Sequence, residues 1–440
     1  MKYNRQLTDE EFKFFLLNDY SEKSFSELIT FGLPDSQKKM YNAFIAGDEI
    51  KFFEDPFPSV KLSHNHVVLV KEEKIWEVII VDSLIYLKTG KLSGGMRERI
   101  HKPKSVLGKT NPEWEVKNLI WKKFKEGFKR QITSDSELLL QIPTPEHLCS
   151  SKIDIFPEGK IAIVNQDQDG KGSRVYKINL ESGEQSLILH HDSFLIKSIK
   201  CLANGKSFLF TPQTNNGWQT CKFELETLTF TILAENEFTQ FNSILEISTL
   251  GQIVHATGEN LYQVIDKDNR ILLTEKLIPT KHNFGPVITF SACGNFLILA
   301  FQPVDENEMN ILRIHNLSLG ISFNYQTNQN KPIDGICSLG KRIYLKERFS
   351  KIQIFELHSD KIIFINEIEN FDCSSLFSSI KENQIGVYDN GRLITLDQDG
   401  KVLFKIEEAL HLKGTSAKFL PDSKVLFTGA GIISVVKLDF

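Results

Sequence analysis

Short runs of apolar and β-branched residues, separated by small or turn-forming residues, recur throughout residues 136–440. Each unit has an apolar pair, a turn-forming tetrad and a run of β-branched and aromatic residues, as in CLANGKSFLF at 201. The turn positions are Gly159, Gly205, Gly251, Gly294, Gly340, Asn383 and Ser423, with spacings of 46, 46, 43, 46, 43 and 40. Seven units of four short strands predict a mainly β fold, a seven-bladed β-propeller.

The ends of this repeat region predict how the ring closes. The last unit supplies only three strands, and the segment ELLLQI (137–142) is a lone strand before the first unit. We expect strand 137–142 to provide the missing outer strand of the last blade. It would then join the first blade to the last and leave no frayed sheet edge between them.

The first 135 residues follow a different pattern, which predicts a small helix-rich α+β domain. Helical signals begin at Thr8, with Glu11 in a capping-box position, and continue over 22–30 and from Asp35 to Gly47. The segment 66–81 predicts two strands joined by the turn EEK, and a further strand is expected over 83–87. A helix of about five turns is expected over 111–130, with Asn111 as its N-cap and Pro112 in its first position.

Two repeat units carry a resemblance to a known family. In FLPDSKVLFTGAGIISVVKLD (419–439) a turn precedes a buried strand, and VVKLD stands where an outer strand would end in a Trp-Asp pair. The turn of FSACGNFLILAF (290–301) matches the same pattern. The region resembles a degenerate tryptophan–aspartate (WD) repeat, which implies a propeller fold and says little about function.

Charge is unevenly distributed between the two regions. Residues 1–135 carry a net charge of +3, and residues 136–440 carry −7. Thirteen Lys and Arg residues against four Glu residues lie within 88–130. This segment has two interpretations, a packed amphipathic helix with a solvated basic face, or a patch that binds nucleic acid, a phosphoinositide headgroup or an acidic partner. The candidate anion-binding residues are Arg97, Arg99, Lys102 and Lys104 on an exposed loop, with Lys122 and Lys123.

The same segment contains fragments of nucleotide-binding motifs. LSGG at 92–95 has the letters of a cassette signature, and GKT at 108–110 ends like a phosphate-binding loop. A phosphate-binding loop needs glycine at 103, but Pro103 lacks the amide donor and fixes φ. The GKS at 205–207 also lacks the first glycine and lies in a repeat turn. We therefore expect no nucleotide hydrolase.

Other motifs favour structural over chemical interpretations. NQDQDG (165–170) has the spacing of a calcium loop, but its twelfth position is Tyr176, so a hairpin turn is expected here and at DQDG (397–400). His64 and His66 make a weak metal pair, and His190 and His191 are expected in a polar loop between blades. We predict no catalytic residues, metal or cofactor.

Composition changes this picture only slightly. Six scattered cysteines, an N-terminus without an apolar signal core and the lack of a long apolar stretch predict a cytoplasmic protein in a reducing compartment.

Three functions are compatible with these features. The favoured one is a protein-interaction scaffold or adaptor, in which a propeller face binds another protein. The second is an anion-binding adaptor that holds RNA or a phosphoinositide through segment 88–130. The third is an enzyme whose catalytic N-terminal domain is targeted by the propeller. The sequence leaves the partner and the oligomeric state open.

Overall fold

The computed structural model describes most of residues 59–440 and parts of the first 58. The described residues are 12, 15–19, 21, 25, 35–46, 59–60, 66–81, 84–101, 105–106, 109–110, 112–132, 138–146, 150–168, 172–192, 195–214, 217–237, 245–257, 261–276, 278, 286–304, 308–348, 350–368, 375–379, 383–389, 392–406, 416–429 and 431–438. Contacts divide the chain into two compact units, 1–58 and 59–440. The boundary expected near residue 135 lies inside the second unit, and a division there stays a prediction.

The first unit contains a helix and a small aromatic core. Helix α3 (Asp35–Ala46) confirms the helix expected from Asp35. A π-helical turn, η1 (Phe15–Asp19), contributes Phe15, which is fully buried with Phe12 and Met40. The N-cap expected at Thr8 lies outside the described residues, as does the helix expected over 22–30 apart from Phe25.

An antiparallel sheet opens the second unit. Its strands follow the order β5 (Met96–His101), β4 (Leu84–Lys91), β3 (Lys74–Val81), β2 (His66–Lys71) and β8 (Lys129–Arg130). A separate two-residue pair joins β6 (Ser105–Val106) to β7 (Lys109–Thr110). The hairpin expected over 66–81 is confirmed, and the strand expected at 83–87 continues to Lys91 as β4.

Helix α4 (Pro112–Lys125) covers one face of this sheet. Val116 and Ile120 on the helix are fully buried against Val67, Val78 and Ile85 on the strands. The helix is shorter than the five turns expected. It ends because Gly127 takes a positive φ of 89°, after which the chain becomes strand β8.

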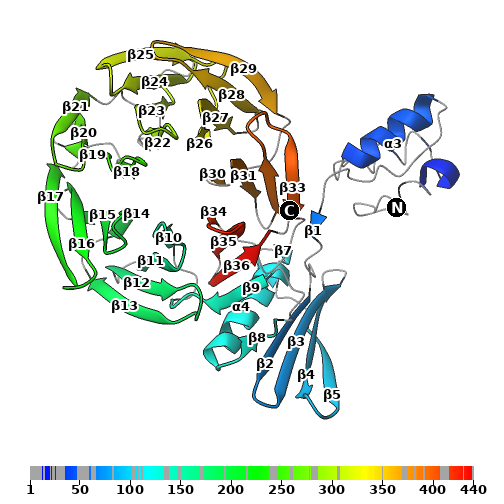
Figure 1. The fold of residues 1–440 in the computed structure, drawn as a ribbon. Helices are drawn as coiled ribbons and strands as arrows, with labels where there is room; N and C mark the ends of the chain where they lie inside the picture. Colours follow the sequence, from blue (N-terminus) through cyan, green and yellow to red (C-terminus); the bar gives the residue numbers. More distant parts are fainter. Residues whose placement is uncertain are drawn as a thin grey trace. The chain divides into compact units, whose positions relative to one another are not determined.

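Residues 138–438 form the propeller (Figure 1), which confirms the fold expected from the repeat. In the described residues each blade is a four-stranded antiparallel sheet. The blades are β10 (Ser150–Ile155), β11 (Ile161–Gln168), β12 (Gly172–Asn179), β13 (Gln185–His191); β14 (Leu195–Cys201), β15 (Ser207–Thr214), β16 (Gly217–Glu224), β17 (Thr229–Glu237); β18 (Leu245–Ile247), β19 (Ile253–Thr257), β20 (Leu261–Ile265), β21 (Ile271–Lys276); β22 (Val287–Phe290), β23 (Phe296–Phe301), β24 (Ile311–Asn316), β25 (Ile321–Gln326); β26 (Ile333–Leu339), β27 (Arg342–Glu347), β28 (Ile352–Leu357), β29 (Ile362–Ile368); β30 (Ser375–Ser379), β31 (Gln384–Asp389), β32 (Arg392–Leu396), β33 (Val402–Ile406); and β34 (Ser416–Leu420), β35 (Lys424–Gly429), β36 (Ile432–Lys437), β9 (Leu138–Pro143).

The seven turn positions read from the sequence all have positive φ, from 51° at Asn383 to 78° at Gly251. Each lies between the first and second strands of its blade. Glycine is favoured at such positions because it has no Cβ to clash in the left-handed region. At Gly159 a Cβ would also lie 2.4 Å from Cδ of Pro421, so this turn requires glycine for space as well as for φ.

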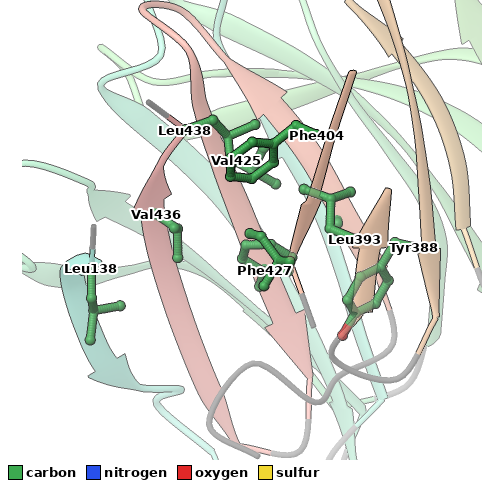
Figure 2. Close-up of a cluster of buried hydrophobic side chains, with 10 residues drawn as sticks. Leu138, Tyr388, Leu393, Phe404, Val425, Phe427, Val436 and Leu438 are labelled. Atoms are coloured by element: carbon green, nitrogen blue, oxygen red, sulfur yellow. The ribbon is translucent and has the colours of Figure 1, made fainter. Parts of the chain in front are cut away.

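Strand β9 closes the ring, as expected from the three-stranded last repeat. It pairs antiparallel with β36, for example Ile142 with Ile433, and Gln141 donates to Ser434 Oγ at 3.0 Å. Figure 2 shows Leu138 beside Val436, in the hydrophobic cluster that joins the last two blades. The first strand of the propeller region is therefore an integral part of its last blade.

The sixth blade gains a fifth strand from the segment before the small sheet. Strand β1 (Ser59–Val60) pairs in parallel with the outer strand β33, at Lys405 and Ile406. No sequence pattern predicted this pair, since it is only two residues long and joins positions far apart in the chain.

Candidate functional site

The basic segment forms the edge of the small sheet, so the loop expected around Arg97 is wrong for residues 96–101. These residues form strand β5, which pairs antiparallel with β4. Residues 96–100 are all exposed, with β5 at the edge of the sheet in the described residues. The charges and the glycine pair before Met96 suggested a loop, but pairing with β4 stabilises a strand without burying it.

The register places Arg97 and Arg99 on the face of the sheet that carries α4. Arg97 pairs with Thr89, and Arg99 pairs with Leu87, which packs against the helix core. Cα partners in an antiparallel pair point to the same face, and neighbours along a strand alternate. Within the described part of the chain, neither guanidinium has an ion-pair partner. The two cations therefore face solvent beside the helix.

The two flanks of α4 have different neighbours. Glu115 hydrogen-bonds His101 at the end of β5, and Lys122 follows seven residues later, nearly two turns along the same flank. On the other flank, Trp121 Nε1 donates to Thr144 O at 3.2 Å, and Lys125 Nζ donates to Pro145 O at 2.8 Å. One flank thus faces the basic edge, and the other contacts the segment after β9.

The structure brings together only part of the expected anion-binding set. Arg97, Arg99 and Lys122 are exposed and share the β5 side of the helix. Lys123 instead pairs with Glu126 at 2.6 Å and lies 5.3 Å from the centroid of the Phe128 ring. Lys102 and Lys104 lie outside the described residues. The role of the set in anion binding stays a prediction.

A second charged cluster lines the innermost strands of the propeller, and it was not predicted from the sequence. Lys418 pairs with Asp154 across the closing blades, and Lys200 Nζ lies 2.6 Å from Glu246 Oε2 across the next two. These side chains alternate in charge over four consecutive blades, which we call the charged arc. Each lies five residues before its turn residue, so the repeat alignment itself carried the signal.

Electrostatics within the charged arc favour the ionised forms. Desolvation acts to raise the pKa of Asp154, but the ammonium groups of Lys418 and Lys200 outweigh it and hold that pKa below its ordinary value. Desolvation acts to lower the pKa of Lys200, but Glu246 and Asp154 outweigh it and raise that pKa. The amide of Cys201 also donates to Asp154 Oδ2 at 2.7 Å. The charges stabilise one another and link neighbouring blades.

The remaining blades have uncharged residues at the equivalent positions, namely Thr289, Gly335 and Ser378. At Gly335 a Cβ would lie 3.1 Å from Cβ of Leu376 on the next blade, so there is little space for a side chain. The inner wall is therefore charged on one side and small and neutral on the other.

The two ends of the blades differ in their connections. At one end, which we call the turn face, the first two and last two strands of each blade are joined by short turns such as 202–206 and 317–320. The opposite end, the loop face, carries the connections between blades and between their middle strands. One of them is the described connection 327–332, between β25 and β26.

A buried polar cluster anchors part of the loop face. Glu347, at the end of β27, is fully buried and accepts bonds from Asn310 Nδ2 at 2.5 Å, Thr327 Oγ1 at 3.2 Å and Gln353 Nε2 at 2.8 Å. Burial raises the pKa of Glu347, partly offset by these donors. The cluster links the connection 327–332 to the fourth and fifth blades.

A hydrogen-bonded chain of Tyr262, His315 and Ser322 also links neighbouring blades. Tyr262 contacts His315 Nε2 through its hydroxyl at 2.6 Å, and His315 Nδ1 contacts Ser322 Oγ at 2.7 Å. Burial lowers the pKa of His315 to about 4, which keeps the imidazole neutral. The chain joins the third blade to the fourth.

The motifs expected to be structural are placed as follows. The hairpin turn expected at 165–170 is wrong for residues 165–168, which end strand β11, and 169–170 lie outside the described residues. Ser173 and the Ile196 amide donate to the carboxylate of Asp167 in β11, so Asp167 joins two blades. DQDG at 397–400 is a hairpin turn in which Asp397 accepts from the amides of residues 399 and 401. GKS at 205–207 is a repeat turn, as expected.

Of the histidines singled out in the sequence, His66, His190 and His191 are described, and all three lie in strands. His190 and His191 end β13, so the loop expected between the blades begins after them. His66 lies in β2 with Nε2 2.5 Å from Glu77 Oε1, and His64 is outside the described residues. Among the described residues no group of three His, Cys, Asp or Glu side chains could hold a metal ion. No helix in the described part of the chain is long and apolar enough to cross a membrane.

Comparisons with known proteins agree with the fold. No family model and no curated protein matches the sequence. The β-propeller domain of Myceliophteria thermophila Cps50 (Swd1) is similar in structure, with a TM-score of 0.51 and 13% identity over 69% of this chain and 100% of that one. A chain of a mitotic checkpoint complex has a TM-score of 0.53 and 12% identity over 70% of this chain and 98% of its own. The region is thus a β-propeller in fold.

Proposed function

We propose that this protein is an interaction scaffold whose propeller binds another protein on its loop face. The observation that carries the proposal is the unequal distribution of connections between the two faces. The turn face carries short turns within blades, whereas the loop face carries the connections between blades, such as 327–332. Loops on a rigid base can vary in sequence without disturbing the core, which suits them to recognition. One structural neighbour is a chain of a mitotic checkpoint complex, and this supports the same general role.

Two exposed residues of the fourth blade give a matched test. Val304 is 58% exposed in the connection after β23 on the loop face, and Leu319 is 60% exposed in the turn after β24 on the turn face. We expect Val304→Arg to remove a partner that co-purifies with the full chain, and Leu319→Arg to retain it. If Val304→Arg retains the partner and Leu319→Arg loses it, the partner binds the turn face and the proposal is wrong.

A second proposed function is an anion-binding adaptor. It is favoured by the exposure of Arg97 and Arg99 and by their lack of ion pairs among the described residues. Changing Arg97, Arg99, Lys102 and Lys104 together to Glu should abolish retention on heparin and leave the melting temperature nearly unchanged. A wild-type protein that passes through heparin without delay at about 50 mM salt would contradict polyanion binding.

We place the scaffold in the cytoplasm, and the free thiols of Cys201, Cys221, Cys293 and Cys337 support this.

A further inference from the structure

We infer that strand β5 is a docking edge for an extended acidic segment of a partner protein, which would add to the small sheet as a sixth strand. The inference rests on the proposed scaffold function and names the chemistry of one partner. In the described residues β5 pairs only with β4, and Met96, Arg97, Glu98, Arg99 and Ile100 are all exposed. An edge of this kind presents unpaired amide and carbonyl groups that a further strand can satisfy.

The face beside α4 specifies acidic residues. Arg97 and Arg99 both point to this face, two positions apart, and Lys122 lies on the adjoining flank of the helix. Residues directly opposite each other on neighbouring strands interact, and opposite charges there are favourable. An incoming strand would therefore place one carboxylate beside Arg97 and another beside Arg99.

The opposite face of the sheet determines which residues the incoming strand would need at its other positions. Glu77, Lys88 and Glu98 form a cross-strand row of alternating charge, in which Lys88 Nζ lies 3.8 Å from Glu98. The next position in this row would take a basic residue. Met96 and Ile100, which are 41% and 54% exposed, flank Glu98 on the same face and would take apolar neighbours.

These positions define the partner segment as apolar, acidic, basic, acidic, apolar. The pattern is symmetric, so it holds for a parallel or an antiparallel addition. A membrane surface fits less well, because strand alternation puts the exposed apolar side chains and the arginines on opposite faces. A nucleic acid fits less well, because it makes no use of a free strand edge.

The test uses the full-length protein and fluorescent, end-blocked peptides with the core Val-Glu-Lys-Glu-Val. A control peptide, Glu-Val-Lys-Val-Glu, has the same composition and net charge, with the positions of Glu and Val exchanged. We expect the first to bind at least about tenfold more tightly, because only it aligns carboxylates with both arginines. Equal affinities, or no measurable binding of either peptide, would overturn the inference.

Backbone methylation separates strand addition from simple charge attraction. Alternate residues of an added strand direct their amides toward the same neighbour. Of two peptides N-methylated at the odd or the even positions of the core, we expect one to lose binding and the other to keep it. Equal effects of the two methylations would mean that no strand is formed, and would overturn the inference.

Charge exchange on the protein gives the last control. Arg97→Glu with Arg99→Glu should abolish binding of the first peptide and create binding of Val-Lys-Lys-Lys-Val, which also shows that the edge is still folded. The matched variant, Lys267→Glu with Lys276→Glu, has the same change in charge on exposed residues of the third blade and should bind like wild type. A loss of peptide binding in the matched variant as well would overturn the inference. If the peptides fail while Val304→Arg still removes the partner, the docking edge is wrong and the scaffold stands.

Discussion

Replacing a single leucine in β9 tests whether this strand closes the ring. Leu138 is 2% exposed and packs with Val436 and Phe427, whereas its neighbour Leu139 is 42% exposed on the other side of the strand. Leu138→Ala removes buried carbon atoms and leaves a cavity, which costs about 3 kcal/mol by comparison with other buried leucines. Leu139→Ala should change the free energy of unfolding by less than about 0.5 kcal/mol.

The assay is chemical and thermal unfolding of the full chain, with amide hydrogen exchange of β36 as a local readout. At roughly 2 °C per kcal/mol, Leu138→Ala should lower Tm by about 6 °C. Exchange should also rise in residues 432–436, since these residues pair with β9. Equal stability of the two variants, or unchanged exchange in β36, would refute closure by β9.

Three further predictions follow from the charged arc, the turns and the nucleotide motifs. The folded pKa of Asp154 lies below its ordinary value of about 3.9, so the ionised carboxylate stabilises the fold. The extra stability of wild type over Asp154→Asn, measured by unfolding against pH, should be full at pH 6 and decline as pH falls below about 4. A difference that grows in acid would contradict the ion pair with Lys418. Gly159→Ala should lower the free energy of unfolding by about 3 kcal/mol and Gly340→Ala by only about 1 kcal/mol. Both glycines have positive φ, but only at Gly159 would a Cβ clash with Pro421. Equal losses would show that the clash with Pro421 does not contribute. Magnesium-ATP at about 10 µM should leave Tm unchanged, and protection at that concentration would contradict the interpretation of the glycine motifs.

The propeller could be predicted from the sequence because each blade is marked by residues close together in the chain. A turn residue such as Gly205 needs positive φ, and the strand after it begins with a continuous run of buried residues, so each blade repeats a short pattern that survives sequence divergence. Closure by strand 137–142 followed from the incomplete last repeat. These features depend on neighbouring residues or on a count of strands.

Features that depend on distant contacts were harder to predict. Strand Met96–His101 has no buried side that would mark it as a strand, and it exists because β4 offers it an edge. The pairing of Lys418 with Asp154 requires the last and first blades to be adjacent, although the repeat alignment does place the two residues in equivalent positions. The contact of Trp121 with Thr144 joins helix and propeller and has no local signal at all.

Cross-linking of the protein to a captured partner tests the scaffold proposal most directly. Lys331 is exposed on the loop face, and Lys160 and Lys206 are exposed on the turn face. With a lysine-reactive reagent and mass spectrometry, we predict that a partner bound at about one-to-one stoichiometry cross-links to Lys331 and leaves Lys160 and Lys206 unmodified by the partner. Cross-links confined to Lys160 and Lys206, or the absence of any protein bound at that stoichiometry, would contradict a scaffold that binds through its loop face.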